Sequence, residues 1–468
     1  MPKIELIKVQ KPSIPKGSRD FGPDQMIRRN YILDNIKKVF QKYGFAPIET
    51  PTMENLSVLT GKYGDEGDQL IFKVLNSGDF LSKTNQEDID QGSKFLTNKI
   101  SEKGLRYDLT VPFARFVVMH QNDITFPFKR YQIQPVWRAD RPQKGRYREF
   151  YQCDVDTVGT DSLLSEAEII LIINDVFTAL KLNDYSIKIN NRKVLTGIVE
   201  TIGAEGKETE FCVAIDKLDK IGKEKVLEEL INRGFRKEKI GLLDPIFELT
   251  GSNEEKIEFL SKFLQNSKVG IKGIKELQEI LNYTQQYRAT EHNVEIDITL
   301  ARGLSYYTGA IIEVKPTSVQ MGSICGGGRY DNLTGVFGLK GVSGVGISFG
   351  VDRIYDVMTE LELFPESGAS TVQVLVANFG NETLSASLKI LNTLRDKGVN
   401  AEIYPDGAKM KKQFNYADKK GIKNVLVIGE DELKNNQFAL KNMSTGEQKK
   451  YTSDELIIHL LADSSITN

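Results

Sequence analysis

Two apolar stretches on either side of a basic turn decide the fold of this chain. "FKRYQIQPVWRAD" (Phe128–Asp140) and "EFYQCDVDTVG" (Glu149–Gly159) flank the segment "RPQKGRY" (Arg141–Tyr147). Two apolar runs separated by a basic segment that contains glycine are typical of a β-hairpin. We therefore expect a hairpin with a long, mobile, positively charged loop, in an antiparallel α+β body.

The rest of the chain predicts helices around this hairpin. Apolar residues at helical spacing indicate a helix over 24–43 that ends at Gly44, followed by a strand over 45–51. Residues 196–287 are rich in Lys, Glu, Leu and Ile and predict consecutive short helices, with strand-like sequence on both sides. After the linker-like "FPESGAST" (364–371), strands and helices alternate as in a small α/β domain with a parallel sheet.

These patterns divide the chain into four parts. We expect a main body in two pieces, 1–195 and 291–362, interrupted by a helical insertion over 196–290, and then a C-terminal α/β domain over 371–468. The predicted fold class is α+β, with a mixed, mostly antiparallel sheet, flanking helices, the helical insertion and the C-terminal α/β domain.

Composition narrows the classes of function. The 468 residues include 62 Lys and Arg against 64 Asp and Glu, so contact with a nucleic acid has to use local patches. Three widely separated cysteines do not show the spacing of a zinc site or of a disulfide framework. No window reaches the roughly 18 apolar residues of a membrane span, and the N-terminus lacks a signal-type apolar core. We expect a soluble, cytoplasmic protein that does not associate with a membrane.

Three arginines follow apolar segments, where an unpaired cation is costly. Arg138 ends the first strand of the hairpin, Arg302 precedes a pair of tyrosines, and Arg353 follows "GVGISFGVD". One such arginine alone would be assigned to a structural ion pair. Three on one sheet are what a triphosphate site would need, because a guanidinium group binds phosphate or carboxylate oxygens through two parallel hydrogen bonds.

Two glycine clusters lie near these arginines. Gly344–Gly350 precedes Arg353, and Gly326–Gly328 lies earlier in the chain. They would allow a ligand to come close, although close packing of strands explains them as well. Neither cluster has the pattern of a dinucleotide fingerprint or of a Walker loop, so a conventional Rossmann or P-loop site is not expected. Asp352 is predicted to cap the helix that carries Arg353.

Several of these stretches resemble the motifs of one enzyme family. "VWRADRPQKGRYREFYQCD" (Val136–Asp154) is similar to motif 2 of the class II aminoacyl-tRNA synthetases, and "GVGISFGVDRI" (Gly344–Ile354) to their motif 3. "ARGLSYYTG" (Ala301–Gly309) resembles the signature of the histidyl-tRNA synthetases. Three further stretches match the same family in the same order: "PKGSRDFGP", "LRYDLTVPFAR" and "GGGRYDNL". The resemblance runs from about Ile14 to the end of the chain.

The resemblance implies an ATP-dependent ligase with a class II catalytic domain and a C-terminal anticodon-binding domain. Such enzymes activate L-histidine with ATP to histidyl-adenylate, release pyrophosphate, and transfer histidine to the 3′ end of tRNA(His). It also implies Mg²⁺ bound with ATP, for which we assign no metal-binding residues. A twofold homodimer would form through motif 1, around Pro47–Met53, and the helical insertion would approach the acceptor stem of the tRNA.

The same resemblance assigns the ATP site. Arg138 would hold the α-phosphate and the substrate carboxylate together, and Arg302 would lie opposite as the distinctive catalytic residue that stabilises charge on phosphorus. The adenine, the γ-phosphate and the pyrophosphate would be contacted by Asp140, Arg146, Phe150 and Arg353. Without its flanking strands, the loop would be explained equally well as a solvated basic turn.

For histidine, the resemblance assigns residues that bind an ammonium group and an imidazole. The α-amino group would be bound by Asp108, Thr110 and Gln152, and the ring nitrogens by Asp156 and Tyr307, with Tyr306 beside them. A carboxylate accepts from one ring N–H, and a tyrosine hydroxyl can pair the other nitrogen. Without the resemblance, the two aspartates would be assigned to turns or strand ends.

The chain departs from the usual family pattern. Ser305 replaces the aspartate of the signature, and aspartates replace glutamates at Asp108, Asp140 and Asp156. Two alternatives stay open: a non-catalytic paralogue that binds histidine as the regulatory subunit of a transferase, and a class II synthetase for threonine, proline or glycine. The three arginines and the C-terminal domain disfavour the first, and the signature disfavours the second.

A local basic cluster in the C-terminal domain could position an RNA backbone without reading bases. It consists of Lys409, Lys411, Lys412, Lys419, Lys420 and Lys423. Each of these lysines is explained equally well as ordinary solvated surface.

Overall fold

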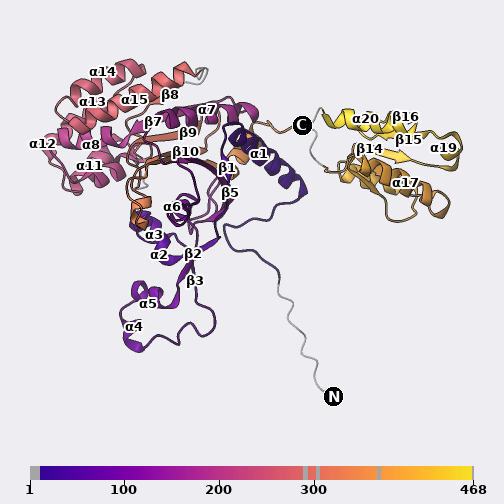
Figure 1. The fold of residues 1–468 in the computed structure, drawn as a ribbon, viewed down its shortest axis with the longest axis horizontal. Helices are drawn as coiled ribbons and strands as arrows, with labels where there is room; N and C mark the ends of the chain where they lie inside the picture. The colour runs from indigo at the N-terminus through magenta and orange to yellow at the C-terminus, as the bar shows by residue number, and fades with distance from the viewer. Residues whose placement is uncertain (1–10, 288–293, 302–305, 366–369, 466–468) are drawn as a thin grey trace. The chain divides into compact units, whose positions relative to one another are not determined.

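The computed structural model of the chain describes residues 11–287, 294–301, 306–365 and 370–465. The chain divides into two compact units (Figure 1): one contains Ile32–Leu363 with the chain before Asp20, and the other contains Asp20–Tyr31 with the chain from Phe364 onward. Helix α1 (Pro23–Lys42) agrees with the helix predicted over 24–43. Gly44 follows with φ +79°, a left-handed conformation that a glycine adopts at little cost.

An eight-stranded sheet forms the centre of the first unit, in the order β1-β5-β6-β11-β10-β9-β7-β8. Its strands are β1 (Ala46–Pro47), β5 (Phe128–Trp137), β6 (Glu149–Val158), β7 (Tyr185–Asn191), β8 (Val294–Ile296), β9 (Ala310–Pro316), β10 (Cys325–Tyr330) and β11 (Gly344–Gly350). The pairs β1–β5 and β7–β8 are parallel and the other described neighbours are antiparallel. The predicted mixed, mostly antiparallel sheet is confirmed.

The predicted hairpin is the longest pairing of this sheet. Strands β5 and β6 are in register from Phe128 opposite Val158 to Trp137 opposite Glu149. The strand predicted over 45–51 was too long, since only Ala46 and Pro47 pair with β5. The Ile48 backbone N–H still donates to the Tyr131 carbonyl at 3.0 Å, and Pro51 has no backbone N–H with which to extend the ladder.

Helices cover the apolar face of the sheet. Phe40 of α1 lies with its ring centroid 5.8 Å from both Tyr131 and Phe349, on β5 and β11. Phe177 of α7 (Leu164–Ala179) lies 5.8 Å from Phe349. Helix α7 is strongly apolar, which agrees with its burial. None of the helices in the described part of the chain is long and apolar enough to cross a membrane.

A three-stranded sheet with short helices lies between β1 and β5 in the chain. Its order is β2-β4-β3, with β2 (Met53–Asn55), β3 (Lys73–Val74) and β4 (Lys103–Leu105). The helices of this region are α2 (Leu56–Leu59), α3 (Gly64–Gln69), α4 (Gln86–Asp90), α5 (Ser93–Ile100) and α6 (Thr110–Met119). Figure 1 shows α4 and α5 on an arm that leaves the body at β3.

Consecutive short helices connect β7 to β8, as the sequence predicts. They are α8 (Arg192–Thr201), α9 (Glu208–Ile215), α10 (Leu218–Ile221), α11 (Lys223–Asn232), α12 (Lys237–Ile240), η1 (Gly241–Leu243), α13 (Asp244–Phe247), α14 (Asn253–Phe263) and α15 (Lys268–Gln286). Figure 1 shows them as one group beside β7 and β8. Helices α8 and α15 pack closely because both carry glycine at the contact: a Cβ on Gly197 would lie 2.6 Å from the Gly270 Cα.

The second unit contains a five-stranded sheet in the order β13-β12-β14-β15-β16. Its elements are β12 (Val374–Val376), α17 (Asn381–Asp396), β13 (Ala401–Ile403), α18 (Met410–Lys419), β14 (Asn424–Val427), α19 (Glu430–Asn435), β15 (Phe438–Asn442), β16 (Gln448–Tyr451) and α20 (Ser453–Ser465). The predicted parallel arrangement is confirmed for β12, β13 and β14. The sequence interpretation missed the antiparallel hairpin of β15 and β16, whose strands are joined by a short loop through Gly446.

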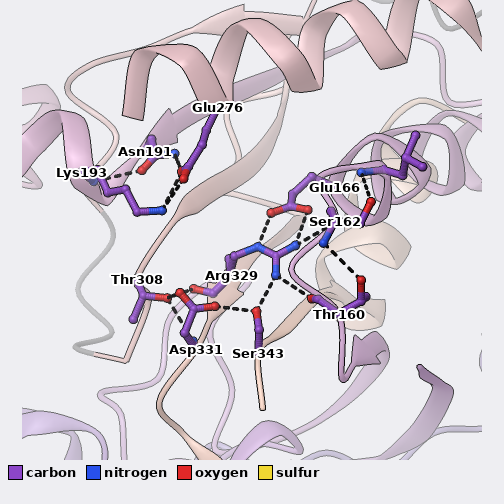
Figure 2. A network of polar contacts seen from close by, with 11 residues as sticks. Thr160, Ser162, Glu166, Asn191, Lys193, Glu276, Thr308, Arg329, Asp331 and Ser343 are labelled. Atoms are coloured by element: carbon purple, nitrogen blue, oxygen red, sulfur yellow. Dashed lines mark hydrogen bonds and ion pairs between the residues drawn. The ribbon is translucent and has the colours of Figure 1, made fainter. Parts of the chain in front are cut away.

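A buried ion pair joins the central sheet to α7 (Figure 2). The guanidinium group of Arg329, on β10, donates from Nε to Oε1 of Glu166 at 2.5 Å and from Nη2 to Oε2 at 2.6 Å. Its Nη1 donates to the Thr160 carbonyl at 3.0 Å and to Ser343 Oγ at 2.5 Å. Burial raises the pKa of the Glu166 carboxyl, and the pairing with Arg329 opposes that shift.

The same network continues to the end of the tyrosine signature. Asp331 accepts from Ser343 Oγ at 2.5 Å and from Thr308 Oγ1 at 2.7 Å. The Thr308 backbone N–H donates to the Arg329 carbonyl at 2.8 Å. Figure 2 shows these side chains converging from separate segments, so the network fixes Thr308 against the sheet.

We expect Glu166→Gln to lower the free energy of unfolding by about 3–5 kcal/mol, because it leaves the Arg329 charge buried without its carboxylate partner. Urea unfolding followed by circular dichroism measures the change. The control is Glu360→Gln, whose carboxylate pairs with Lys144 at 2.9 Å between largely exposed side chains and whose loss should cost less than about 1 kcal/mol. Equal losses in the two variants would contradict the role of the buried pair.

Candidate active site

One face of the central sheet carries a row of polar side chains. The register places Arg130 opposite Asp156 and Gln132 opposite Asp154, and alternation along β5 and β6 puts all four side chains on the same face. Across β11, Gly346 lies opposite Asp156. A Cβ on Gly346 would lie 1.9 Å from Asp156 Oδ1, so a glycine is required for this carboxylate to lie over the strand.

Asp108 is buried just before α6. Its Oδ1 accepts from the Tyr63 hydroxyl at 2.9 Å and from the Val111 backbone N–H at 3.1 Å, and its Oδ2 accepts from the Tyr306 hydroxyl at 3.4 Å. Burial raises the pKa of the Asp108 carboxyl, opposed by these hydrogen bonds and by the positive charge of Arg138. Thr110 starts α6 and forms a hydrogen bond with Tyr306, which lowers the pKa of that tyrosine against the larger effect of burial.

Asp156 lies on β6 between a cation and a phenol. Its Oδ2 is 2.7 Å from Arg130 Nη2, and its Oδ1 accepts from the Tyr330 hydroxyl at 2.6 Å. The Arg130 side chain has no exposed surface, and its guanidinium carbon lies 4.1 Å from the centroid of the Phe113 ring. Burial raises the pKa of the Asp156 carboxyl, while Arg130 and Tyr330 favour the ionised form.

Asp154 is a second buried carboxylate on the same strand. Its Oδ2 lies 4.0 Å from Arg130 Nη2, farther than the closer partner Asp156. Burial raises the pKa of Asp154 to about 7, and the neighbouring Asp156 adds to that increase. One guanidinium therefore serves two carboxylates, which leaves this part of the face negatively charged when both are ionised.

The tyrosine pair enters the same region from the chain before β9. The Tyr306 and Tyr307 ring centroids are 4.9 Å apart, and Tyr307 is buried. A Cβ on Gly328 would lie 3.0 Å from the Tyr307 ring, so this glycine also makes room for a side chain of the site. Arg302 and Ser305, singled out in the sequence, lie outside the described residues.

Arg138 follows β5, and its charge acts on Asp108. Its Nε donates to the Tyr107 carbonyl at 3.1 Å, and its guanidinium carbon lies 4.3 Å from the Tyr107 ring centroid and 5.1 Å from that of Phe150. Within the described residues, no carboxylate lies within 4.0 Å of its nitrogens. A structural ion pair with those residues therefore does not account for Arg138. The side chain is available to an anionic ligand.

Arg353 connects helix α16 (Val351–Glu360) to the hairpin loop. Its Nε donates to the Gly145 carbonyl at 2.7 Å, and its Nη1 to the Ser323 carbonyl at 2.5 Å. The prediction that Asp352 caps this helix was wrong: Gly350 is the N-cap, and Asp352 lies inside the first turn. There its carboxylate pairs with Arg19 and accepts from the Tyr151 backbone N–H at 3.1 Å.

The loop residues predicted to contact ATP lie at the hairpin end. Asp140 Oδ1 is 3.7 Å from Arg146 Nη1, and the Arg146 side chain is 45% exposed. The sequence interpretation thus selected two neighbouring groups, one around Asp108 and Asp156 and one around Arg138. It missed Tyr63, Arg130, Asp154 and Tyr330, which complete the buried charge network. Polar residues occur at every second position of both hairpin strands, and this pattern in the sequence could have identified Arg130 and Asp154.

Comparisons with known proteins identify the family of the chain. Residues 74–354 match the family model of histidyl-tRNA synthetase, and residues 373–462 match an anticodon-binding domain. The Histidine–tRNA ligase of Cytophaga hutchinsonii is 60% identical over 453 residues, covering 97% of this chain and 100% of that protein. The one from Bacteroides fragilis is 57% identical over 448 residues, covering 96% and 98%. The crystal structure of histidyl-tRNA synthetase from Nostoc sp. PCC 7120 matches with a TM-score of 0.83 and 33% identity, covering 97% and 100%.

A mostly antiparallel sheet with an arginine-bearing hairpin, followed by a separate α/β unit, defines a class II aminoacyl-tRNA synthetase. The chain belongs to the histidyl-tRNA synthetase family. Because the relatives extend over nearly the whole chain, the regulatory subunit and the synthetases for other amino acids are set aside.

We expect Asp154→Asn to raise the melting temperature of the ligand-free protein at pH 8. The folded state holds the Asp154 proton more tightly than the unfolded state does, so raising the pH from about 4 to about 7 costs the folded state stability at this site. Removing the carboxylate abolishes that cost, and the gain should shrink as the pH is lowered toward 5. Calorimetry at several pH values measures it, and a gain independent of pH would contradict the prediction.

Proposed function

We propose that this chain acts as a histidine–tRNA ligase through the residues of the candidate active site. The observation that carries the proposal is a cation beside a carboxylate: Arg138 donates to the Tyr107 carbonyl, and Asp108 is the next residue along the chain. An amino acid is a zwitterion, so its carboxylate would bind Arg138 while its ammonium group would bind Asp108. Thr110 and Gln152 would complete the binding of the ammonium group.

The imidazole would be bound by the deeper part of the same face. Asp156 is held by Arg130 and Tyr330. An ionised carboxylate can only accept hydrogen bonds, so Asp156 would accept from a ring N–H. Tyr307 would pair the other ring nitrogen, with Tyr306 packed against it. A site of buried hydrogen bonds should reject analogues that lack the ring nitrogens by roughly 10⁴-fold or more, because its polar groups would be left unpaired.

ATP would bind at the hairpin end of the site. Arg138 would bring the α-phosphate and the histidine carboxylate within attack distance and offset their repulsion. Arg302 would stabilise the charge that builds on phosphorus from the opposite side. The remaining contacts, to the adenine and the outgoing pyrophosphate, would come from Asp140, Arg146, Phe150 and Arg353.

Mg²⁺ is proposed to bind together with ATP, neutralising phosphate charge. Among the residues that the structure describes, no group of three or more His, Cys, Asp or Glu side chains could hold a metal ion. We assign no protein residues to this ion.

The assembly and location of the protein are part of the same proposal. We place it in the cytoplasm as a twofold homodimer that pairs through motif 1, around Pro47–Met53. The second unit would bind the anticodon arm of tRNA(His) with the basic residues of α18 and its flanks. Lys420 in that group lies 3.0 Å from Glu402, so it would contribute less to an RNA contact than the others.

ATP–pyrophosphate exchange tests the proposed function. We expect exchange with histidine alone among the twenty amino acids. No exchange together with histidine binding would instead support a regulatory protein, and exchange with another amino acid would support a different synthetase.

We further expect Arg302→Ala to slow histidine-dependent exchange by about 10²-fold or more while changing the affinity for histidine far less, because the arginine would act on the transition state. Initial rates and equilibrium dialysis give the two values. Arg233→Ala, in the helical insertion, is the matched control and should leave both unchanged. Equal losses of rate and affinity in Arg302→Ala would mean that the residue is structural.

A further inference from the structure

In the described part of the chain, one of the two polar groups of the Gln152 side chain has a hydrogen-bond partner and the other has none. Its Nε2 donates to Ser348 Oγ at 2.6 Å. Its Oε1 is buried and, within the described part of the chain, has no hydrogen-bond partner. A buried amide oxygen without a donor costs roughly 1–3 kcal/mol, so its presence at this site indicates a donor on a ligand.

The two neighbouring amides on this face are satisfied differently. Gln132 donates from Nε2 to Thr50 Oγ1 at 2.8 Å and to Gln134 Oε1 at 2.6 Å, and its Oε1 accepts from Arg130 Nη1 at 3.4 Å. Gln134 Oε1 also accepts from Arg106 Nη1 at 2.8 Å. Both amide oxygens therefore face protein donors, and Gln152 differs from them in this respect.

The orientation of the Gln152 amide follows from the chemistry of its neighbours. An amide can rotate by 180° and exchange its oxygen and nitrogen, so its partners decide which atom faces the site. Ser348 lies directly opposite Asp154 in the register of β6 and β11. A hydrogen bond from Ser348 lowers the pKa of Asp154, against the larger effect of burial.

This arrangement fixes the direction of the hydrogen bonds that Ser348 forms. Above the pKa of about 7 that burial gives Asp154, its ionised carboxylate can only accept hydrogen bonds, so the single hydroxyl proton of Ser348 goes to Asp154. The hydroxyl oxygen is then an acceptor toward Gln152, which must present its N–H₂ group to Ser348. The amide oxygen of Gln152 consequently points away from Ser348. Without the hydroxyl or the carboxylate, both orientations of the amide become accessible.

We propose that Asp154 and Ser348 are positioning residues for amino-acid recognition: they hold the Gln152 amide with its oxygen toward the substrate, where it accepts from the α-ammonium group. The inference rests on the proposed function, because it takes Gln152 as a contact of that group. The charges that act on Asp154 are two carboxylates, Asp108 and Asp156, and one cation, Arg130. The excess of negative charge favours a cationic ligand.

Two inhibitors that each lack one end of histidine separate this role from general damage to the site. L-Histidinol keeps the amine and lacks the carboxylate, whereas 3-(imidazol-4-yl)propionate keeps the carboxylate and lacks the amine. Their inhibition constants are measured in ATP–pyrophosphate exchange together with KM and kcat for histidine. A structural defect would weaken both inhibitors, while a misoriented Gln152 amide weakens only the ligand with an amine.

We expect Ser348→Ala to raise KM for histidine and the inhibition constant of L-histidinol by about tenfold or more. The inhibition constant of 3-(imidazol-4-yl)propionate should change less than about twofold, and kcat less than about threefold. Asp154→Asn should give the same pattern, and Ser348→Thr, which keeps the hydroxyl, should behave as wild type. Ser261→Ala, which removes a hydroxyl bonded within α14, is the control and should change nothing.

A double-mutant cycle checks that Ser348 acts through Gln152. In a Gln152→Ala background, Ser348→Ala should have no further effect on the binding of L-histidinol. Equal weakening of the two inhibitors in Ser348→Ala, or an undiminished effect in the Gln152→Ala background, overturns the positioning role and leaves the proposed function intact. Absence of histidine-dependent exchange in the wild type overturns the proposed function and this inference together.

Discussion

Arg130 is the buried cation on which the candidate site depends. Its guanidinium lies 2.7 Å from Asp156 and 4.0 Å from Asp154, and none of its side chain is exposed. Isolated charges in such surroundings are very costly, so the three groups can be buried only together. Strands β5 and β6 hold them in register, so the pairing of these two strands brings the charges together.

A second buried arginine ties the surroundings of the site together. Arg329 holds Glu166 of α7, and through Ser343 and Asp331 the network extends to Thr308, directly after the tyrosine pair. The two arginines thus have different tasks. Arg130 balances carboxylates that would face the substrate, whereas Arg329 is saturated by protein acceptors and fixes the frame in which the tyrosines lie.

The acidic groups of the face work against the stability of the ligand-free protein. Burial raises the pKa values of Asp108, Asp154 and Asp156, so holding them ionised near neutral pH costs free energy. A ligand with an ammonium group and a ring N–H would supply the missing donors and positive charge. Strain of this kind is expected where a site is shaped for a substrate rather than for the empty protein.

The sequence by itself determined most of the elements and the family. The alternation in 128–159 predicted the hairpin, the spacing in 24–43 predicted α1, and the order of motifs indicated the family. Arg138 could be selected because it follows an apolar segment, whereas Asp108 and Asp156 were selected only through the resemblance to the family.

Only the tertiary structure decided how these residues are partnered. Tyr63 donates to Asp108 and Tyr330 to Asp156, in each case from a distant part of the chain. Asp154 lies opposite Ser348 on a neighbouring strand, and its proposed positioning role depends on that residue. The length of β1 and the position of the N-cap of α16 likewise depended on the tertiary structure around them. The physical reason is that local propensity and periodicity act over a few residues, whereas burial, hydrogen-bond partners and pKa values are set by groups that meet only when the sheet has formed.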